Sequence, residues 1–189
     1  MIQQMQDNRK IVHGNQHPAE QWLNFNHDKA KKDVHKLQQQ IYQATRDREF
    51  RKVTRLQKLL VKSLPARYLA VRRVTSSQRR LTPSIDDKLV ITAEQKWMLV
   101  EELRNKNSYH ADPIRTAYIP KKDGSKRKLG IPTIKDRAMQ ALILMALEAE
   151  WEAKFEPNSF GFRPGRSAID AVQYIGKMFV PRKGKRSHP

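Results

Sequence analysis

The side chains best suited to chemistry lie around a predicted turn at Asp123 and Gly124. Residues 118–138 hold seven lysines and arginines, among them Lys121 before the turn and Arg127 after it. An ammonium group offers a point charge to a phosphate, and a guanidinium offers a planar fork of donors. Strands on both sides of the turn would hold these donors in place, so the pattern predicts a phosphate-binding hairpin. The alternative is a solvated edge hairpin, whose lysines only discourage pairing with other strands.

The length of the turn decides whether Lys121 and Arg127 face the same way. A two-residue loop, Asp123-Gly124, pairs Lys121 with Lys126 and leaves Arg127 on the other face. A three-residue loop over residues 123–125 pairs Lys121 with Arg127 on one face. If both side chains bind one phosphate chain, we therefore expect an odd-length loop or a bulge.

A second basic loop, with the sequence GFRPGR, follows at residues 161–166. Its glycines allow positive φ or a close approach to a ligand, and its proline stiffens the chain between them. Arg163 and Arg166 flank this stiff turn and are candidate phosphate contacts. The alternative is a plain strand-to-helix connection with two exposed arginines.

The composition indicates a polyanionic partner. The chain has 38 Lys and Arg against 19 Asp and Glu, which gives a formal net charge of +19 and a pI near 10.4. Each neutralised phosphate releases counterions, so RNA or DNA is the first candidate. An anionic membrane surface is the second, but no basic helix shows a clean apolar face of Trp, Phe and Leu. Four arginines that follow Tyr68 are further candidate contacts: Arg72, Arg73, Arg79 and Arg80.

Other classes of site are not supported by the sequence. The chain has no cysteine, and hence no disulfide framework or thiolate metal site. His13 and His17 have the spacing of a metal-binding pair, but no third ligand is evident. Asp86 and Asp87 are neighbours in sequence, so their side chains point away from each other. We therefore expect no metal site. The longest apolar run, residues 141–147, is far shorter than the ~20 residues of a membrane span, and the N-terminus lacks a signal-peptide core. We therefore expect a cytoplasmic protein without a membrane partner. The same run is apolar on nearly every side, so its helix should be buried from more than one direction.

The spacing of apolar residues predicts a mostly helical chain with one hairpin. Asp28 is the expected N-cap of a long helix, and Thr92 with Gln95 forms a capping box before another. Pro65 should interrupt a helix, because proline removes a donor and clashes with the preceding turn. Ser167 and Asp170 should cap the last helix. A short helix is expected from Pro18, and longer helices over residues 28–46, 49–64, 66–74, 93–104 and 134–151. A last helix is expected from residue 168. The two strands of the hairpin are expected over residues 113–118 and, after the turn, up to residue 129.

Three segments, in order along the chain, resemble those of group II intron-encoded reverse transcriptases. Residues 63–76 are similar to the N-terminal extension, 119–138 to the first reverse transcriptase motif and 158–171 to the second. The resemblance implies an α+β fold, in which a mostly helical N-terminal extension precedes fingers with an antiparallel β-hairpin and an incomplete palm. The expected parts are a flexible polar arm at 1–17, a basic helical extension at 18–90, fingers and the start of the palm at 91–180, and a basic tail at 181–189.

The resemblance also implies roles for the basic residues. Lys121 and Arg127 would contact the triphosphate of an incoming deoxynucleoside triphosphate. RNA, as template or intron, and a DNA primer are the implied partners, and Mg²⁺ is implied for the complete enzyme. The implied RNA contacts are Arg72, Arg73, Arg79, Arg80, Lys122, Lys126, Arg163 and Arg166.

The carboxylates that such an enzyme needs are not expected within these residues. Nucleotidyl transfer uses two metal ions held by carboxylates, which in this family follow beyond the last residue here. Residues 171–189 contain no Asp or Glu. We therefore expect no catalytic residue and no metal ligand in this chain, and no polymerisation by it alone. Its status as an enzyme stays open, and a separate palm-containing chain is a further expected partner.

Three hypotheses follow. The chain is the N-terminal portion of a reverse transcriptase/maturase, as a truncated frame, a split product or an engineered piece. Alternatively, it is an RNA-binding maturase-like module that aids intron splicing without polymerase activity. In the third hypothesis the resemblance misleads, and the chain is a basic RNA-binding protein of ribosomal type.

Overall fold

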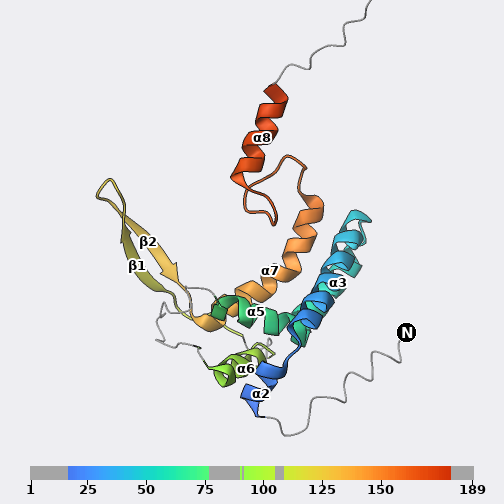
Figure 1. Ribbon diagram of the computed structural model, residues 1–189, viewed down its shortest axis with the longest axis vertical. Coiled ribbons are helices and arrows are strands. Elements are labelled where there is room, and N and C mark those ends of the chain that lie inside the picture. Colours follow the sequence, from blue (N-terminus) through green and yellow to red (C-terminus); the bar gives the residue numbers. More distant parts are fainter. Residues whose placement is uncertain (1–16, 77–89, 91, 105–108, 180–189) are drawn as a thin grey trace, which may run out of the picture.

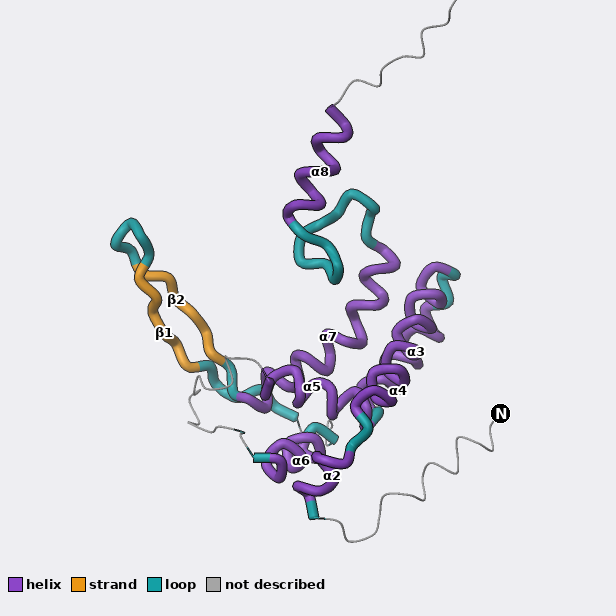
Figure 2. The backbone as a smooth tube through the Cα atoms, viewed as in Figure 1, coloured by secondary structure: helices purple, strands orange, loops and turns teal. Residues whose placement is uncertain are grey.

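The structure is a computed structural model that describes residues 17–76, 90, 92–104 and 109–179. Within these residues, helices dominate and one antiparallel hairpin projects from them, which confirms the predicted α+β fold (Figure 1; Figure 2). The arm up to residue 16, the basic tail, Arg79 and Arg80 lie outside the described residues. The elements are α2 (Pro18–Asn24), α3 (His27–Arg46), α4 (Phe50–Lys62), α5 (Leu64–Ser76), α6 (Ala93–Glu102), β1 (Arg115–Pro120), β2 (Lys126–Ile131), α7 (Ile134–Lys154) and α8 (Ala168–Phe179).

Polar side chains set where the helices begin. Asn26 caps α3, because its Oδ1 accepts the backbone N–H of Lys29 at 2.8 Å. The prediction of Asp28 as the cap is wrong. Asn26 has the extended backbone of a cap, whereas Asp28 lies in the first turn, where its charge favours the helix dipole. Thr92 and Gln95 form the predicted capping box before α6, each side chain bonding the backbone N–H of the other residue.

The chain breaks between α4 and α5 as predicted, but the break is at Ser63, and Pro65 is the second residue of α5, which begins at Leu64 rather than Ala66. Ser63 ends α4, and its Oγ accepts the N–H of Ala66 at 3.3 Å. Proline is tolerated at this position because the first N–H groups of a helix have no partner within it.

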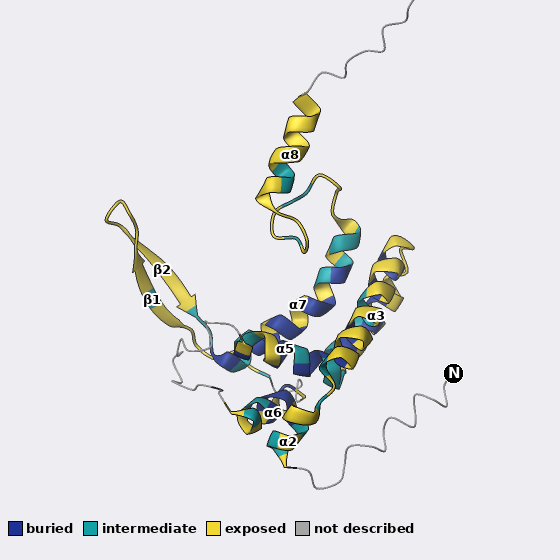
Figure 3. Ribbon diagram, viewed as in Figure 1, coloured by how far each residue is buried: buried dark blue, intermediate teal, exposed yellow. Residues whose placement is uncertain are grey.

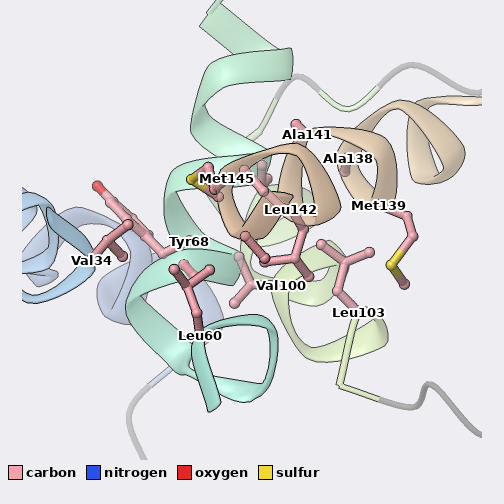
Figure 4. Close-up of a cluster of buried hydrophobic side chains, with 14 of the residues drawn as sticks. Val34, Leu60, Tyr68, Val100, Leu103, Ala138, Met139, Ala141, Leu142 and Met145 are labelled. Atoms are coloured by element: carbon pink, nitrogen blue, oxygen red, sulfur yellow. The ribbon is translucent and has the colours of Figure 1, made fainter. Parts of the chain in front are cut away.

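One hydrophobic core joins the helices, with α5 at its centre. α5 packs against α3, α4, α6 and α7. Figure 4 shows Leu60, Tyr68, Val100 and Leu142, from four different helices, within one cluster of buried side chains. The ring of Tyr68 lies 4.7 Å from that of Trp22, measured between centroids. The core takes side chains from both the predicted extension and the predicted fingers, so the two segments are packed together.

The predicted burial of residues 141–147 is found on one side of α7 only. α3, α4 and α5 pack against this helix, and Leu142 is fully buried. On the other side, Ile143, Leu144 and Leu147 are each at least 40% exposed. Figure 3 shows the resulting alternation of buried and exposed residues along α7.

α8 leaves an apolar face uncovered. Ser167 and Asp170 form the predicted cap, in which the N–H of Ser167 donates to Oδ2 of Asp170 at 2.7 Å. Val172, Ile175 and Phe179 are exposed, and no residue of this helix is buried (Figure 3).

The hairpin is an exposed arm whose base is tied to the helical body. In its two strands, every residue except Ala117 and Ile131 is exposed. The chain enters β1 from residues 109–114 and leaves β2 directly into α7 (Figure 1). The orientation of the arm therefore depends on how these flanking segments are held.

A buried carboxylate, that of Asp136 in the first turn of α7, holds the base of the hairpin. Its Oδ1 accepts the hydroxyl of Tyr109, and its Oδ2 accepts the Thr133 hydroxyl at 2.9 Å and the N–H of Asp112 at 3.2 Å. Burial, and then the hydrogen bond to Asp136, raise the pKa of Tyr109, so its hydroxyl remains a donor. Beside this junction, Lys135 pairs with Glu102 of α6 at 2.9 Å. We call Asp136 and its three partners, Tyr109, Asp112 and Thr133, the Asp136 junction.

Replacing Asp136 with asparagine should loosen the hairpin. Asparagine has the same shape as aspartate, but its amide NH₂ is a donor and would face groups that now donate to the carboxylate. A buried polar group left without a partner costs about 1–3 kcal/mol. We expect that loss in the free energy of unfolding by urea, together with faster amide exchange in residues 109–131. Asp28→Asn, an exposed control, should cost about 0.5 kcal/mol or less. Unchanged exchange in the hairpin of Asp136→Asn would contradict this account.

Two leucines two residues apart on α7 should respond differently to truncation. Leu142→Ala removes a fully buried side chain and should lower the free energy of unfolding by about 2–5 kcal/mol. Leu144→Ala removes an exposed side chain, and its cost should stay below about 1 kcal/mol. Urea denaturation of both variants tests this. Equal losses would show that the outer face of α7 is covered in solution.

Candidate nucleic-acid interface

A three-residue loop, Lys122 to Gly124, closes the hairpin. The N–H of Lys121 donates to the carbonyl of Ser125 at 2.8 Å, and the N–H of Gly124 donates to the carbonyl of Lys121 at 3.1 Å. Gly124 has φ of +80°. Such a turn followed by a left-handed glycine is the common geometry of three-residue hairpin loops. The loop is thus odd in length, as expected if Lys121 and Arg127 bind one phosphate chain.

The register places Lys121 and Arg127 on one face of the hairpin. Ile119 lies opposite Arg127, and the loop hydrogen bonds place Lys121 opposite Ser125. Because opposite and alternate residues share a face, Lys121 and Arg127 are diagonal neighbours, with Cα atoms ~7–8 Å apart. The prediction that they lie directly opposite each other is wrong. The loop begins one residue earlier than predicted, at Lys122 and not at Asp123, so Arg127 lies opposite Ile119.

Asp123 explains this shift. Its Oδ1 accepts both the N–H of Ser125, at 3.0 Å, and the Ser125 hydroxyl, at 2.7 Å. These two bonds draw Ser125 back towards the strand and leave the left-handed position to Gly124. The same hydrogen bonds, that of the hydroxyl first, lower the pKa of Asp123.

The remaining hairpin lysines are distributed differently. Lys126 lies opposite Pro120 and Lys128 opposite Tyr118, which places both lysines on the face away from Lys121 and Arg127. Lys122 lies in the loop itself. The hairpin therefore offers cations on both faces, and one face brings together the two residues predicted to bind a nucleotide.

Arg163 holds the second loop in shape. Its side chain is only 6% exposed. The guanidinium pairs with Glu152 of α7, with Nη2 2.8 Å from Oε2 and Nε 3.1 Å from Oε1. Nη1 donates to the carbonyls of Glu156 and Ser159 at 2.8 and 2.9 Å. The ring of Phe155 lies 5.1 Å from the guanidinium carbon. With these donors engaged, the geometry does not favour the predicted phosphate contact of Arg163.

The tip of the second loop is more open. Gly165 has φ of +67°, as expected for a glycine in this turn, and Phe162 has φ of +59°. A left-handed conformation is uncommon for an aromatic residue, and the Phe162 side chain is fully exposed. Arg166 stays exposed, with Nη1 on the carbonyl of Pro157 at 3.0 Å and its guanidinium 5.3 Å from the ring of Phe160.

The other predicted contacts do not join the hairpin. Arg72 and Arg73 are exposed on α5, and one N–H of Arg72 donates to the Tyr68 hydroxyl at 3.3 Å. The hairpin meets α7 at the N-terminal end of that helix, whereas the second loop follows its C-terminal end (Figure 1). A helix of this length spans ~30 Å, so the two loops are separate parts of the surface.

A groove of about 780 Å³ lies between α3 and α7, away from the hairpin. Four glutamines of α3 line it, and Pro164 is the single residue of the second loop that does so. Among the described residues, no group of three His, Cys, Asp or Glu side chains could hold a metal ion. None of the helices described here is long and apolar enough to cross a membrane.

Three functionally placed residues were not predicted. Asp136 supports the hairpin, Glu152 fixes Arg163, and Phe162 is exposed in a strained conformation. Asp136 is a single acid between Lys135 and Arg137, and Glu152 is one of four glutamates in residues 148–156, so only the spatial partner reveals the role of each. Phe162 lies within the GFRPGR motif, where the glycines on both sides gave the only local sign of unusual backbone.

Comparisons with known proteins identify the family. The model for the N-terminal domain of reverse transcriptase matches residues 22–103, and that for reverse transcriptase (RNA-dependent DNA polymerase) matches residues 119–187. Protein YkfC of Escherichia coli is 38% identical over 64% of this chain and 33% of its own length. Group II intron-encoded protein LtrA of Lactococcus lactis is 35% identical over 59% of this chain and 19% of its own. Maturase-like protein 1 of Euglena gracilis is 32% identical over 75% of this chain and 31% of its own.

The chain thus spans about a third or less of the length of these relatives. The two family models match in the order expected of a reverse transcriptase, and together they cover most of the residues. The chain belongs to the reverse transcriptases of the group II intron-encoded kind and matches their N-terminal portion.

Proposed function

We propose that the chain is the substrate-binding portion of a reverse transcriptase/maturase, in which the hairpin holds the triphosphate of the incoming nucleotide. The observation that carries the proposal is the register, which puts Lys121 and Arg127 on one face as diagonal neighbours. Both are exposed, and neither pairs with a carboxylate in the described part of the chain. Their donors are therefore available to phosphate oxygens, the arginine as a fork and the lysine as a point charge.

RNA is the proposed macromolecular partner. The excess of positive charge supports it, since neutralising phosphates releases counterions and relieves self-repulsion. A DNA primer is proposed as the second strand. Arg163 is proposed to shape the second loop and not to contact phosphate, because Glu152 occupies its guanidinium. The proposed RNA contacts are Arg72, Arg73, Arg79, Arg80, Lys122, Lys126 and Arg166.

We further propose that these residues do not polymerise without a palm segment. Mg²⁺, which the family implies, would bring the reacting oxygens together, but the described residues offer no cluster that fits it. The contribution of this chain is to bind and orient nucleotide and RNA. A maturase-like module that aids splicing without copying is the alternative proposal, and one relative is named maturase-like. Primer extension with and without a palm segment separates the two, and extension by the 189-residue chain alone would refute both.

The hairpin assignment can be tested in the protein joined to its palm segment. Lys121→Ala and Arg127→Ala each remove a hydrogen bond from a charged donor, a loss of about 1.5–3 kcal/mol, so kcat/KM for nucleotide should fall about 10- to 100-fold. Steady-state primer extension measures it. Lys128→Ala is the matched control, because Lys128 is the neighbour of Arg127 but points to the other face. Equal effects of all three variants would rule out a face-specific triphosphate site.

A further inference from the structure

The two donors of the nucleotide site lie at the end of the hairpin that is far from the helical body. Lys121 follows β1, and Arg127 is the second residue of β2. Every strand residue except Ala117 and Ile131 is exposed, so the two strands are held mainly by their pairing with each other. The direction of the hairpin is therefore set where the chain enters β1 and where it leaves β2.

Tyr109 fixes the segment that enters the hairpin. Its ring packs against the hydrophobic core, and its hydroxyl donates to Oδ1 of Asp136 in the first turn of α7. The hydroxyl stays protonated, because burial and then the hydrogen bond to Asp136 raise the pKa of Tyr109. The N–H of Asp112 donates to the same carboxylate at 3.2 Å. One side chain of the helix that follows the hairpin thus binds the segment that precedes it at two points.

The segment that leaves the hairpin meets the same carboxylate. The Thr133 hydroxyl donates to Oδ2 of Asp136 at 2.9 Å, and both residues are buried. Beside this contact, Ile114 lies against Gly130, since a Cβ atom on this glycine would be 2.8 Å from Cδ1 of Ile114. The two ends of the hairpin are therefore closely packed and are joined through Asp136.

α6 is tied to the same place through Lys135. Its Nζ lies 2.9 Å from Oε1 of Glu102 in α6 and 5.8 Å from the centroid of the Tyr109 ring. The hydrogen bond to Glu102 raises the pKa of Lys135, so the lysine keeps its charge. Tyr109 thus contacts the core, α7 and a lysine that is paired with α6.

We propose that Tyr109 and Asp136 are positioning residues for the nucleotide site. Neither can touch a nucleotide held by Lys121 and Arg127, because they lie at the opposite end of the hairpin. They instead determine how often the hairpin points in the direction in which both donors reach the triphosphate. When only a fraction of molecules is competent to bind, the apparent affinity falls by that fraction. This inference rests on the proposed function and adds residues that control the site from a distance.

The test uses Tyr109→Phe in the protein joined to its palm segment. Phenylalanine keeps the ring against the core and removes the hydroxyl that bonds Asp136. We expect the correctly directed fraction to fall to about a tenth, so that KM for nucleotide rises about tenfold while kcat stays within about twofold. Steady-state primer extension measures both constants. The matched control is Tyr118→Phe, which removes the hydroxyl of an exposed tyrosine in β1 and should change neither.

A double-mutant cycle shows whether Tyr109 acts through the two donors. In a background with Lys121→Ala and Arg127→Ala, the direction of the hairpin no longer matters to the triphosphate, so Tyr109→Phe should raise KM less than about twofold. A role in stability alone would instead reduce the amount of folded enzyme, and hence kcat, by the same factor in both backgrounds. Affinity for an RNA template annealed to its primer, measured by fluorescence anisotropy, should be the same with and without Tyr109→Phe.

The outcomes that would overturn the inference can be told apart. If Lys121→Ala and Arg127→Ala impair nucleotide use but Tyr109→Phe leaves KM unchanged, the hairpin binds nucleotide and Tyr109 does not position it. An equal rise in KM in both backgrounds would show that the effect of Tyr109 does not pass through the donors. If Lys121→Ala and Arg127→Ala leave nucleotide use unchanged, the proposed function fails as well.

Discussion

Carboxylates are scarce in this chain, 19 against 38 lysines and arginines, and the fold depends on where they are placed. Several of those in the described residues lie where separate segments must meet. Asp136 gathers the segments at the base of the hairpin, and Glu152 fixes the arginine loop to α7. Glu101 approaches the buried Arg67 of α5 at 3.8 Å, and Glu102 pairs with α7 through Lys135. In a strongly cationic chain, each such contact also reduces self-repulsion at a junction.

The cations that these acids leave unpaired define the outer surface. They include Lys121 and Arg127 on the hairpin and Arg51, Arg55, Lys58 and Lys62 on α4. The hairpin and α4 lie on opposite sides of the body (Figure 2). A polyanion bound to either face would reduce the remaining repulsion, so binding and folding stability should be linked in this protein. The large apolar residues left exposed on α7 and α8 differ from these surfaces, because their side chains carry no charge.

Local signals in the sequence were sufficient for most elements, because each depends on residues three or four positions apart. The Thr92 and Ser167 caps and the helix break next to Pro65 are of this kind. The sequence left the length of the hairpin loop open, and the structure has three residues there. The cap of α3 was misplaced by two residues, since Asn26 and Asp28 are both good capping residues and only backbone geometry separates them. Arg163 could not be assigned from sequence, because its partner Glu152 lies on a preceding helix. The exposed cations of α4 were not singled out from the sequence, because their separation from carboxylates is a property of the fold.

The attachment of the hairpin has a mechanical consequence. From Arg115 to Lys121 the arm is about 20 Å long, and the Asp136 junction lies at its base. A rotation of roughly 10° at the base would move the tip by about 3.5 Å, more than the length of a hydrogen bond. The position of the tip is therefore determined by the side chains of the Asp136 junction, which lie at the other end of the hairpin. The rigidity of the hydrogen bonds around the buried Asp136 carboxylate therefore limits how far the tip of the hairpin can be displaced.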